Sequence, residues 1–509
     1  MKKYTFIVAL LLGTISLIQA QSTVPNDGLR YNDSSLSGTA RFNAMGGAFG
    51  AVGGDLSAIS VNPAGSSFFN YNTASVSFRY ADNQNKSTYL GNNQNKNSSL
   101  FDLNQAGIVF VFSNPAKTLN KFAFAVNYES KNNFKNKVAF NGYNDASDVS
   151  DYFLDFANGT NGLGVFPIQY ATDYGFSSFG NFADQQAWLG YNSYILDYDN
   201  TAGEYYTNIP GQSPGVSFYQ QKNYTQRGYN SKLQFNFSGA IKDKLFLGIN
   251  LNPYFTDYEK SFTIVESNNG VYQTGTTVND VVFDNYIYTT GGGFNLDLGA
   301  IYKVTNAFRV GASYTSPTWY RLTDEVKQGI YTVRTDATNP NNFIGNSIYP
   351  TNSTVFEAYN FRTSGKFTGS LAGIINKRWL ISADATVSDY SKMKYGSNGF
   401  EAINTYYKQN LTTAWEYRVG TEYIIGNVAL RAGYRYIESS FKKDVYAPNG
   451  DTSSITGGIG FNFGKSKLDL AYAYTNRNFS EEYITSTYAN SANVKNINNA
   501  VSLTYTVNF

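Results

Sequence analysis

The sequence predicts an all-β fold, a 14-stranded antiparallel transmembrane β-barrel, and three observations support this prediction. Tyr, Phe and Gly are abundant while only 15% of the residues are charged, a composition that suits strands with one face in lipid. Fourteen segments of strand length alternate in side-chain character with a period of two. The gaps between these segments alternate between long and short.

The first 20 residues are predicted to form a secretory signal peptide. Two lysines, Lys2 and Lys3, precede an apolar stretch from Phe6 to Ile18, and Ala20 is a small residue suited to cleavage. That stretch is shorter than the roughly 20 apolar residues that a transmembrane helix needs. No later stretch is long and apolar enough to span a membrane, so we expect no transmembrane helix in the mature chain.

Two residue types are absent from the sequence, and their absence excludes several kinds of catalytic and metal-binding site. The chain contains no Cys and no His, which excludes disulfides, thiolate or imidazole metal sites and a His-dependent catalytic triad. The net charge of +2 gives no electrostatic basis for nucleic-acid binding. We therefore predict a protein that is not an enzyme and needs no metal or cofactor.

Side-chain alternation marks each predicted strand. The final run, AVSLTYTVNF, places aliphatic and aromatic residues on one face and Ser, Thr and Asn on the other. An even number of strands keeps both ends of a bacterial barrel on one side of the membrane. The predicted strands are residues 73–80, 105–113, 121–129, 230–241, 245–258, 294–304, 307–316, 362–375, 378–390, 413–425, 428–440, 452–463, 466–478 and 498–509.

Loop lengths provide an independent signal. Tight turns at one rim and long loops at the other are typical of outer-membrane barrels, whereas a soluble sandwich has no reason to alternate them. Because lipid satisfies no backbone hydrogen bond, the strands must pair all the way round. The short gaps are residues 114–120, 242–244, 305–306, 376–377, 426–427 and 464–465, and the long ones are 81–104, 130–229, 259–293, 317–361, 391–412, 441–451 and 479–497.

Several blocks of the sequence resemble the FadL-type (OMPP1/FadL/TodX) family of outer-membrane transporters for hydrophobic compounds. The N-terminal block SGTARFNAMGGAFGAVGGDLSAISVNPAG (Ser37–Gly65) resembles the family's N-terminal signature. Residues 309–319, 416–439 and 454–475 resemble further family blocks, whereas 130–229 resembles none. The matching signature residues are Met45, Gly46, Gly47, Asp55, Ser57, Ala58, Asn62, Pro63, Ala64 and Gly65.

This resemblance implies that residues 21–72 fold back as a hatch, or plug, inside a barrel formed by residues 73–509. Glycine and alanine permit close backbone packing, and Asn62-Pro63 favours a fixed turn because proline restricts itself and its predecessor. A fourteen-stranded barrel is also too wide for its own side chains to fill. The alternative is a glycine-rich leader outside the pore. The predicted hatch residues are Asp55, Ser57, Asn62, Pro63, Ala64 and Gly65.

Two groups of residues are candidates for ligand binding. In the long extracellular loop at about 130–229, aromatic residues at helical spacing suggest a first-contact groove, or else a core that packs the loop against itself. In the lumen, a basic residue would pair with a ligand carboxylate, or else with Glu422 or the hatch. The candidates are Phe153, Phe156, Trp188 and Tyr191 in the loop, and Arg309, Arg431 and Arg435 in the lumen.

The predicted function is passive transport of hydrophobic compounds, such as long-chain fatty acids, across the outer membrane of a Gram-negative bacterium. Loops capture the ligand, the lumen binds it and hatch movement releases it. The resemblance also implies lateral exit at a distorted third strand, although residues 121–129 contain no Pro or Gly. The alternatives are a receptor for haem, through Tyr, or for a surface partner, and a lipid hydrolase, which the missing His disfavours.

The expected partners follow from that function. They are a hydrophobic small molecule, outer-membrane lipid and the barrel-assembly machinery. The last of these would recognise the terminal aromatic strand that ends at Phe509. We expect the protein to be a monomer.

Overall fold

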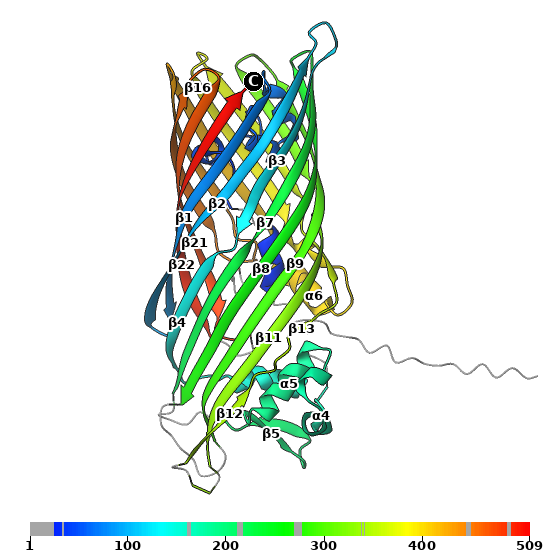
Figure 1. Ribbon diagram of the computed structural model, residues 1–509, viewed down its shortest axis with the longest axis vertical. Helices are drawn as coiled ribbons and strands as arrows, with labels where there is room; N and C mark the ends of the chain where they lie inside the picture. The colour runs from blue at the N-terminus through cyan, green and yellow to red at the C-terminus, as the bar shows by residue number, and fades with distance from the viewer. Residues whose placement is uncertain are drawn as a thin grey trace, which may run out of the picture.

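The computed structural model of the protein describes residues 25–32, 35–159, 164–210, 217–268, 277–336, 338–339, 342–443, 449–485 and 490–509. Within these residues, most strands form one antiparallel sheet that closes into a barrel (Figure 1). β1 (Thr73–Tyr89) closes it by pairing with β2 (Asn92–Ser113) on one side and β22 (Ser491–Asn508) on the other. The predicted fold class is confirmed. The predicted signal peptide, residues 1–20, lies outside the described residues.

The described wall consists of fourteen spans, and each predicted strand lies in one of them. Four spans contain two successive strands because the backbone breaks once along them. After β1 and β2 come β3 (Leu119–Asn133) with β4 (Asn136–Asn144), β7 (Phe218–Ile241), β8 (Leu245–Asn268), β9 (Val278–Lys303), β10 (Phe308–Thr315) with β11 (Trp319–Thr335), β14 (Tyr359–Arg362) with β15 (Lys366–Ile375), β16 (Trp379–Asp389) with β17 (Lys394–Tyr395), β18 (Thr413–Ile425), β19 (Val428–Ile437), β20 (Thr452–Asn462), β21 (Ser466–Glu482) and β22.

The remaining elements lie inside the wall or in its loops. β12 (Phe343–Ile348) and β13 (Thr354–Val355) pair with β11, while β5 (Leu196–Asp199) pairs with β6 (Glu204–Thr207) in a separate small sheet. None of the described helices is long and apolar enough to cross a membrane. The helices are η1 (Pro25–Gly28), α1 (Leu29–Asn32), α2 (Ala40–Ala44), η2 (Ser57–Ser60), η3 (Pro63–Phe68), α3 (Ser150–Ala157), α4 (Ile168–Asp173), η4 (Phe176–Ser178), α5 (Phe182–Asn192), η5 (Tyr390–Lys392) and α6 (Glu401–Asn410).

The alternation in the sequence separates a lipid-facing surface from the lumen. In β21, Leu470 and Tyr472 are 44% and 48% exposed, whereas Asp469 and Ala471, which alternate with them, are buried. The outward side chains are apolar because they meet lipid, and the inward ones are small or polar because they face the barrel's contents. The wall is therefore apolar on its outer surface and mixed inside.

The two ends of the barrel differ, as the gap lengths predict. The short turns lie at the upper end in Figure 1, together with the C-terminus, and the long loops lie at the other end. Several short turns place consecutive residues in the left-handed region, including Lys242 and Asp243 (φ 50° and 49°) and Asn376 and Lys377 (φ 51° and 57°). Such turns match the twist of paired strands. In bacterial barrels the end with short turns faces the periplasm.

Part of the predicted long loops is in fact strand. Residues 81–104 form the outer halves of β1 and β2, joined by a two-residue turn at Leu90 and Gly91 (φ 46° and 83°). These residues are mostly Asn, Gln, Ser and Lys, and they lack the apolar face by which the other strands are recognised. Beyond the membrane both faces of a strand contact water or other loops, so the pattern of alternating hydrophobicity disappears there.

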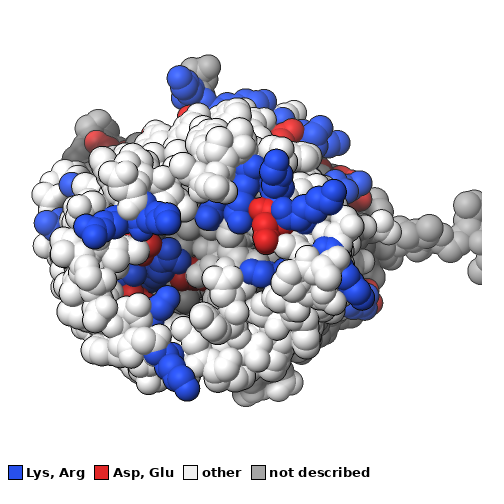
Figure 2. Space-filling model, turned by 90° about the horizontal axis from the view of Figure 1, so that it is seen from above, with Lys and Arg blue, Asp and Glu red and all other residues white. Residues whose placement is uncertain are grey.

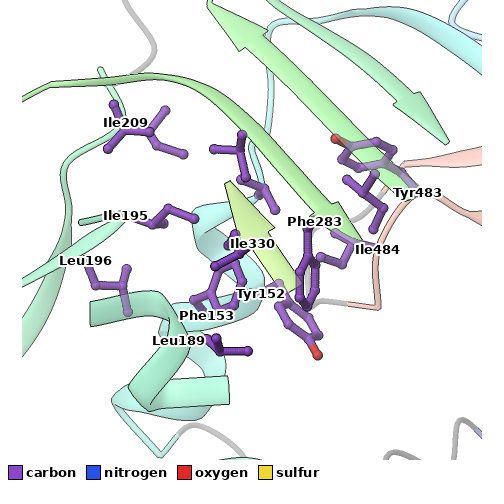
Figure 3. Close-up of a cluster of buried hydrophobic side chains, with 14 of the residues drawn as sticks. Tyr152, Phe153, Leu189, Ile195, Leu196, Ile209, Phe283, Ile330, Tyr483 and Ile484 are labelled. Atoms are coloured by element: carbon purple, nitrogen blue, oxygen red, sulfur yellow. The ribbon is translucent and has the colours of Figure 1, made fainter. Parts of the chain in front are cut away.

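The long loop between β4 and β7 forms a compact unit, called here the loop domain (residues 145–217, described except for 160–163 and 211–216). Its helices α3 and α5 pack on β9 and β11 through a buried cluster that includes Phe153, Leu189, Phe283 and Ile330 (Figure 3). α3 and α5 coincide with the two aromatic stretches of the predicted loop at 130–229.

Candidate ligand pathway through the barrel

Residues 35–72, called here the lumen segment, lie inside the barrel. Thr456 Oγ1 in β20 donates to Ala44 O (2.9 Å), and Ser382 Oγ in β16 donates to Ala48 O (2.6 Å). On the other side of the wall, Ser60 Oγ donates to Glu129 in β3. Because these strands lie on different sides of the closed sheet, the segment crosses the lumen. It appears within the upper half of the barrel in Figure 1.

Asp55 and Ser57 tie the two halves of the lumen segment together. The Asp55 carboxylate accepts from Thr39 Oγ1 (2.8 and 2.9 Å) and from Ser57 N (2.9 Å). Ser57 Oγ accepts from Thr39 N (2.7 Å). All three residues are buried, so these bonds are shielded from water and hold the start of α2 against η2.

Asn62 connects the lumen segment to the wall. Its side-chain oxygen accepts from Ala64 N (3.1 Å) and caps η3, and its Nδ2 donates to Gly50 O (2.8 Å) and to Ala300 O in β9 (3.1 Å). Pro63 occupies the first position of η3, where its missing N–H costs nothing. The predicted turn at Asn62-Pro63 is present in the structure.

Two wall glycines make room for this turn. Gly248 in β8 and Gly299 in β9 are cross-strand partners. A Cβ at Gly299 would lie 2.0 Å from Asn62 Oδ1, and one at Gly248 would lie 2.3 Å from the Pro63 carbonyl carbon. Any larger residue would displace the turn. Ala64 and Gly65 complete it: Ala64 is fully buried, and Gly65 O accepts from Gly54 N (3.0 Å).

Buried ion pairs link the lumen segment to the wall and surround two of the predicted basic residues. Arg41 in α2 donates from Nε and Nη2 to Glu422 (2.9 and 2.8 Å). Glu422 also accepts from Arg431 Nε (2.6 Å), and Arg431 Nη1 donates to Asp469 (2.7 Å). Arg431 thus has the Glu422 partner that the alternative interpretation assigned to it.

Arg435, the second predicted basic residue on β19, forms a separate group. Its Nε donates to Glu416 (2.6 Å), which also accepts from Arg418 Nε (2.6 Å). Its neutralising partner is therefore Glu416, which the sequence analysis did not name. A ligand role for Arg431 and Arg435 stays a prediction.

Arg309, the third predicted basic residue, has a different environment. Its Nη1 donates to Val52 O in the lumen segment (2.9 Å). Its guanidinium carbon lies 4.5 Å from the centroid of the Phe68 ring. Among the described residues it forms no ion pair with a carboxylate.

The predicted aromatic residues of the loop domain form its core and its edges. Phe153 is fully buried, and its ring centroid lies 5.4 Å from that of Phe283 in β9. Phe156, Trp188 and Tyr191 are partly buried and pack against the same cluster. This is the packing role that the sequence analysis offered as an alternative, and a capture role for the partly buried ones stays a prediction.

Two cavities lie on opposite sides of the lumen segment. The loop-side cavity, about 390 Å³, is bounded by Ser35 and Leu36 of that segment and by wall residues toward the long loops, among them Arg79, Leu100, Asn132, Lys366, Arg435 and Arg477. The turn-side cavity, about 400 Å³, is bounded by Arg41, Val52 and Phe68 of the segment and by wall residues toward the short turns, among them Arg309, Leu380 and Arg431.

Sequence reasoning missed Arg79 and Lys366 as residues of the lumen. Both lie on the polar face of a predicted strand, after Ser75 and Ser77 in β1 and before Thr368 and Ser370 in β15. The alternation alone therefore places them inside the barrel.

The backbone pairing of the wall is interrupted beside the loop-side cavity, and this interruption is called here the break in the wall. β2 pairs with β3 only from Gln105 to Ser113, although β2 continues to pair with β1 as far as Asn92. The register of β3 against β7 shifts between Ser130 and Asn132. The irregularity lies just beyond the predicted third strand, residues 121–129, which explains why that strand carries no sign of it.

The lumen segment begins at this discontinuity. Ser35 N donates to Asn132 Oδ1 (2.8 Å), and Ser37 Oγ donates to Ser130 O. Leu100 of β2 and Asn132 of β3 both line the loop-side cavity, as does Leu36. The cavity therefore reaches the break in the wall at the place where the lumen segment covers it.

A family model described as outer membrane protein transport protein (OMPP1/FadL/TodX) matches residues 233–509, more than half of the chain. A FadL homologue from Pseudomonas aeruginosa is similar in structure, with a TM-score of 0.54 and 13% identity over 94% of this chain and 99% of its own. For the P. putida toluene transporter TodX, the values are 0.50, 15%, 93% and 99%. At these identities the two structures support the fold alone. None of the curated proteins matches the sequence.

Proposed function

This chain belongs to the OMPP1/FadL/TodX family of outer-membrane transport proteins, and on that premise we propose that it transports hydrophobic compounds with an acidic head group, such as long-chain fatty acids. Its place is the outer membrane of a Gram-negative bacterium. Members of the family are transport channels and not enzymes. The proposal concerns the substrate class and the path through the barrel.

The charge of the loop-side cavity is the observation that supports this substrate class. Six basic residues and two acidic ones, Glu416 and Glu438, line this cavity, and one of the six, Arg30, is paired with Asp27 outside it. The basic residues are Arg30, Arg79, Lys135, Lys366, Arg435 and Arg477. Excess positive charge inside a low-dielectric wall favours an anion, whereas a neutral hydrocarbon gains nothing from it. Leu36, Leu100 and Phe134 supply apolar surface beside these charges.

The path begins at the loop domain and ends at the break in the wall. The partly buried Phe156, Trp188 and Tyr191 offer apolar contact at the outer end, and the loop-side cavity then holds the ligand. The lumen segment, part of the predicted hatch at residues 21–72, covers the break between β2 and β3. We propose that hatch movement uncovers this break and releases the ligand laterally, without an energy source.

Uptake of labelled oleate by cells that express the protein tests the proposal. We expect Arg79→Gln to lower oleate uptake several-fold and to leave toluene uptake unchanged, because only oleate carries a charge. Arg227→Gln is the matched control, since Arg227 is 70% exposed, outside both cavities, and pairs with Glu259. Oleate uptake equal to that of cells without the protein would refute the transport of fatty acids.

A further inference from the structure

The turn-side cavity combines an apolar floor with a surplus of cations. Phe68, at the end of η3, stacks on Phe246 of β8 with ring centroids 4.2 Å apart. Val52 and Leu380 are buried beside it in the same cavity. The cavity therefore offers apolar contact on the side of the lumen segment that faces the short turns.

Basic residues outnumber acidic ones around this floor. The two acidic residues, Glu422 and Asp469, are already paired with Arg41 and Arg431. Four further basic residues line the cavity and form no ion pair within the described part of the chain. These are Arg309, Lys377, Arg378 and Lys467.

Arg309 is the most informative of the four. Its Nε is buried and has no hydrogen-bond partner, although Nη1 bonds to Val52 O. Lys303, the cross-strand partner of Arg309, lies against the same aromatic pair, with its Nζ 5.5 Å from the Phe68 centroid and 4.8 Å from that of Phe246. A buried guanidinium N–H without an acceptor is costly, and two cations about one ring repel each other. A bound anion would remove both costs.

The surroundings of the cavity are also positively charged. In Figure 2, which looks at the end with the short turns, Lys and Arg gather around a hollow. The adjoining turns and strand ends add six lysines and one acidic residue, Asp243. The lysines are Lys117, Lys121, Lys242, Lys244, Lys303 and Lys465. Such a rim concentrates anions at the mouth.

We propose that the turn-side cavity binds the anionic head group of an amphiphile, a carboxylate or a phosphate, with its apolar tail on Val52, Phe68 and Leu380. Two sources have this chemistry. One is a free fatty acid that enters from the short-turn end, and the other is a phospholipid of the surrounding leaflet. The site does not depend on the proposed transport, because the lumen segment separates it from the loop-side cavity.

Photo-crosslinking of the purified full-length protein tests the site and its source. The probes are oleate and phosphatidylglycerol, each with a diazirine in the acyl chain, followed by peptide mapping. We expect adducts on peptides that contain Phe68, Ile374 or Leu380. Labelling by oleate identifies a free acid, and labelling by phosphatidylglycerol identifies a membrane lipid. An oleyl alcohol probe, which carries no charge, is expected to label these peptides at least about tenfold less, since charged hydrogen bonds are the strong ones.

Two variants distinguish head-group recognition from general attraction. Lys377→Gln/Arg378→Gln removes two exposed cations from the cavity without touching its core, and we expect it to reduce labelling about tenfold. Arg309→Gln is expected to do the same. The control, Lys242→Gln/Lys244→Gln, removes two cations from a turn outside the cavity. Equal labelling by the neutral probe, or equal losses in the control and in the cavity variants, would overturn the proposal whether or not the protein transports oleate.

Discussion

Replacing Glu422 by Gln is predicted to loosen the lumen segment from the wall. Glu422 accepts two charged hydrogen bonds from Arg41 of the lumen segment and one from Arg431 of the wall. Glutamine keeps the size and one acceptor oxygen but removes the charge. Arg41 then stays in the lumen without a compensating carboxylate, whereas in an opened state water solvates it.

The structure sets the size of this effect. Breaking a buried ion pair from one side costs about 3–5 kcal/mol. The side chain of Arg41 is 22% exposed while that of Glu422 is 6% exposed, so water offsets part of that cost. We therefore expect the substitution to favour opening by about 2 kcal/mol, which corresponds to about a 30-fold increase in the equilibrium constant for opening.

Hydrogen exchange measures this opening directly. We expect amides of α2 and the following turn to exchange about 30-fold faster in the Glu422→Gln variant than in the wild type. Asp469→Asn is the matched control because it removes a buried carboxylate whose one ion pair among the described residues is with Arg431 of the wall. Unchanged exchange in Glu422→Gln, or an equal increase in Asp469→Asn, would refute the reasoning.

The remaining predictions concern the turn, its notch and the loop domain. Asn62→Ala removes the bonds to Gly50 O and Ala300 O, so we expect impaired oleate uptake by a barrel that still assembles. Heat-modifiable electrophoretic mobility measures assembly, and loss of assembly would mean that the turn is structural. Gly299→Ala should lower the thermal stability because its Cβ meets Asn62, while Gly369→Ala, whose Cβ would meet nothing within 4 Å, should not. Burial and the nearby Asp148 raise the pKa of Asp151 to about 6. A raised carboxyl pKa means that the folded state binds more protons, so α3 should lose protection from exchange as the pH rises from 4 to 6. Asp151→Asn should reduce this dependence, and the buried Asp148 and Glu266, whose pKa values are also raised, should retain the rest of it.

The local sequence pattern predicted the wall and offered one of its ion pairs as an alternative to ligand binding. The two-residue turn at Gly426-Asn427 fixes the register of β18 and β19, which places Glu422 opposite Arg431. The position of the turn in the sequence is therefore enough to predict that these two residues face each other. The link from Glu422 to Arg41 could not be predicted in this way, because it depends on how the lumen segment lies in the barrel.

The outer strands and the loop domain were harder to predict for a different reason. Residues 81–104 form paired strands without an apolar face, since no lipid surrounds them. In the loop domain, helical spacing located α3 and α5, but it did not show that Phe153 would pack on Phe283 of β9. Contacts between distant segments follow from the tertiary fold, and periodicity carries no information about them.

A reversible lock between the lumen segment and the wall tests the central claim most directly. The chain has no Cys, so Gly50→Cys/Ser370→Cys introduces the only two thiols; a Cβ at Gly50 would lie 2.9 Å from Ser370 Cβ, within about 1 Å of the usual Cβ separation in a disulfide. If hatch movement releases the ligand, cells that carry the oxidised protein should take up labelled oleate no faster than cells without the protein. Reduction of the disulfide should restore uptake. Equal uptake by the oxidised and reduced protein would contradict the account.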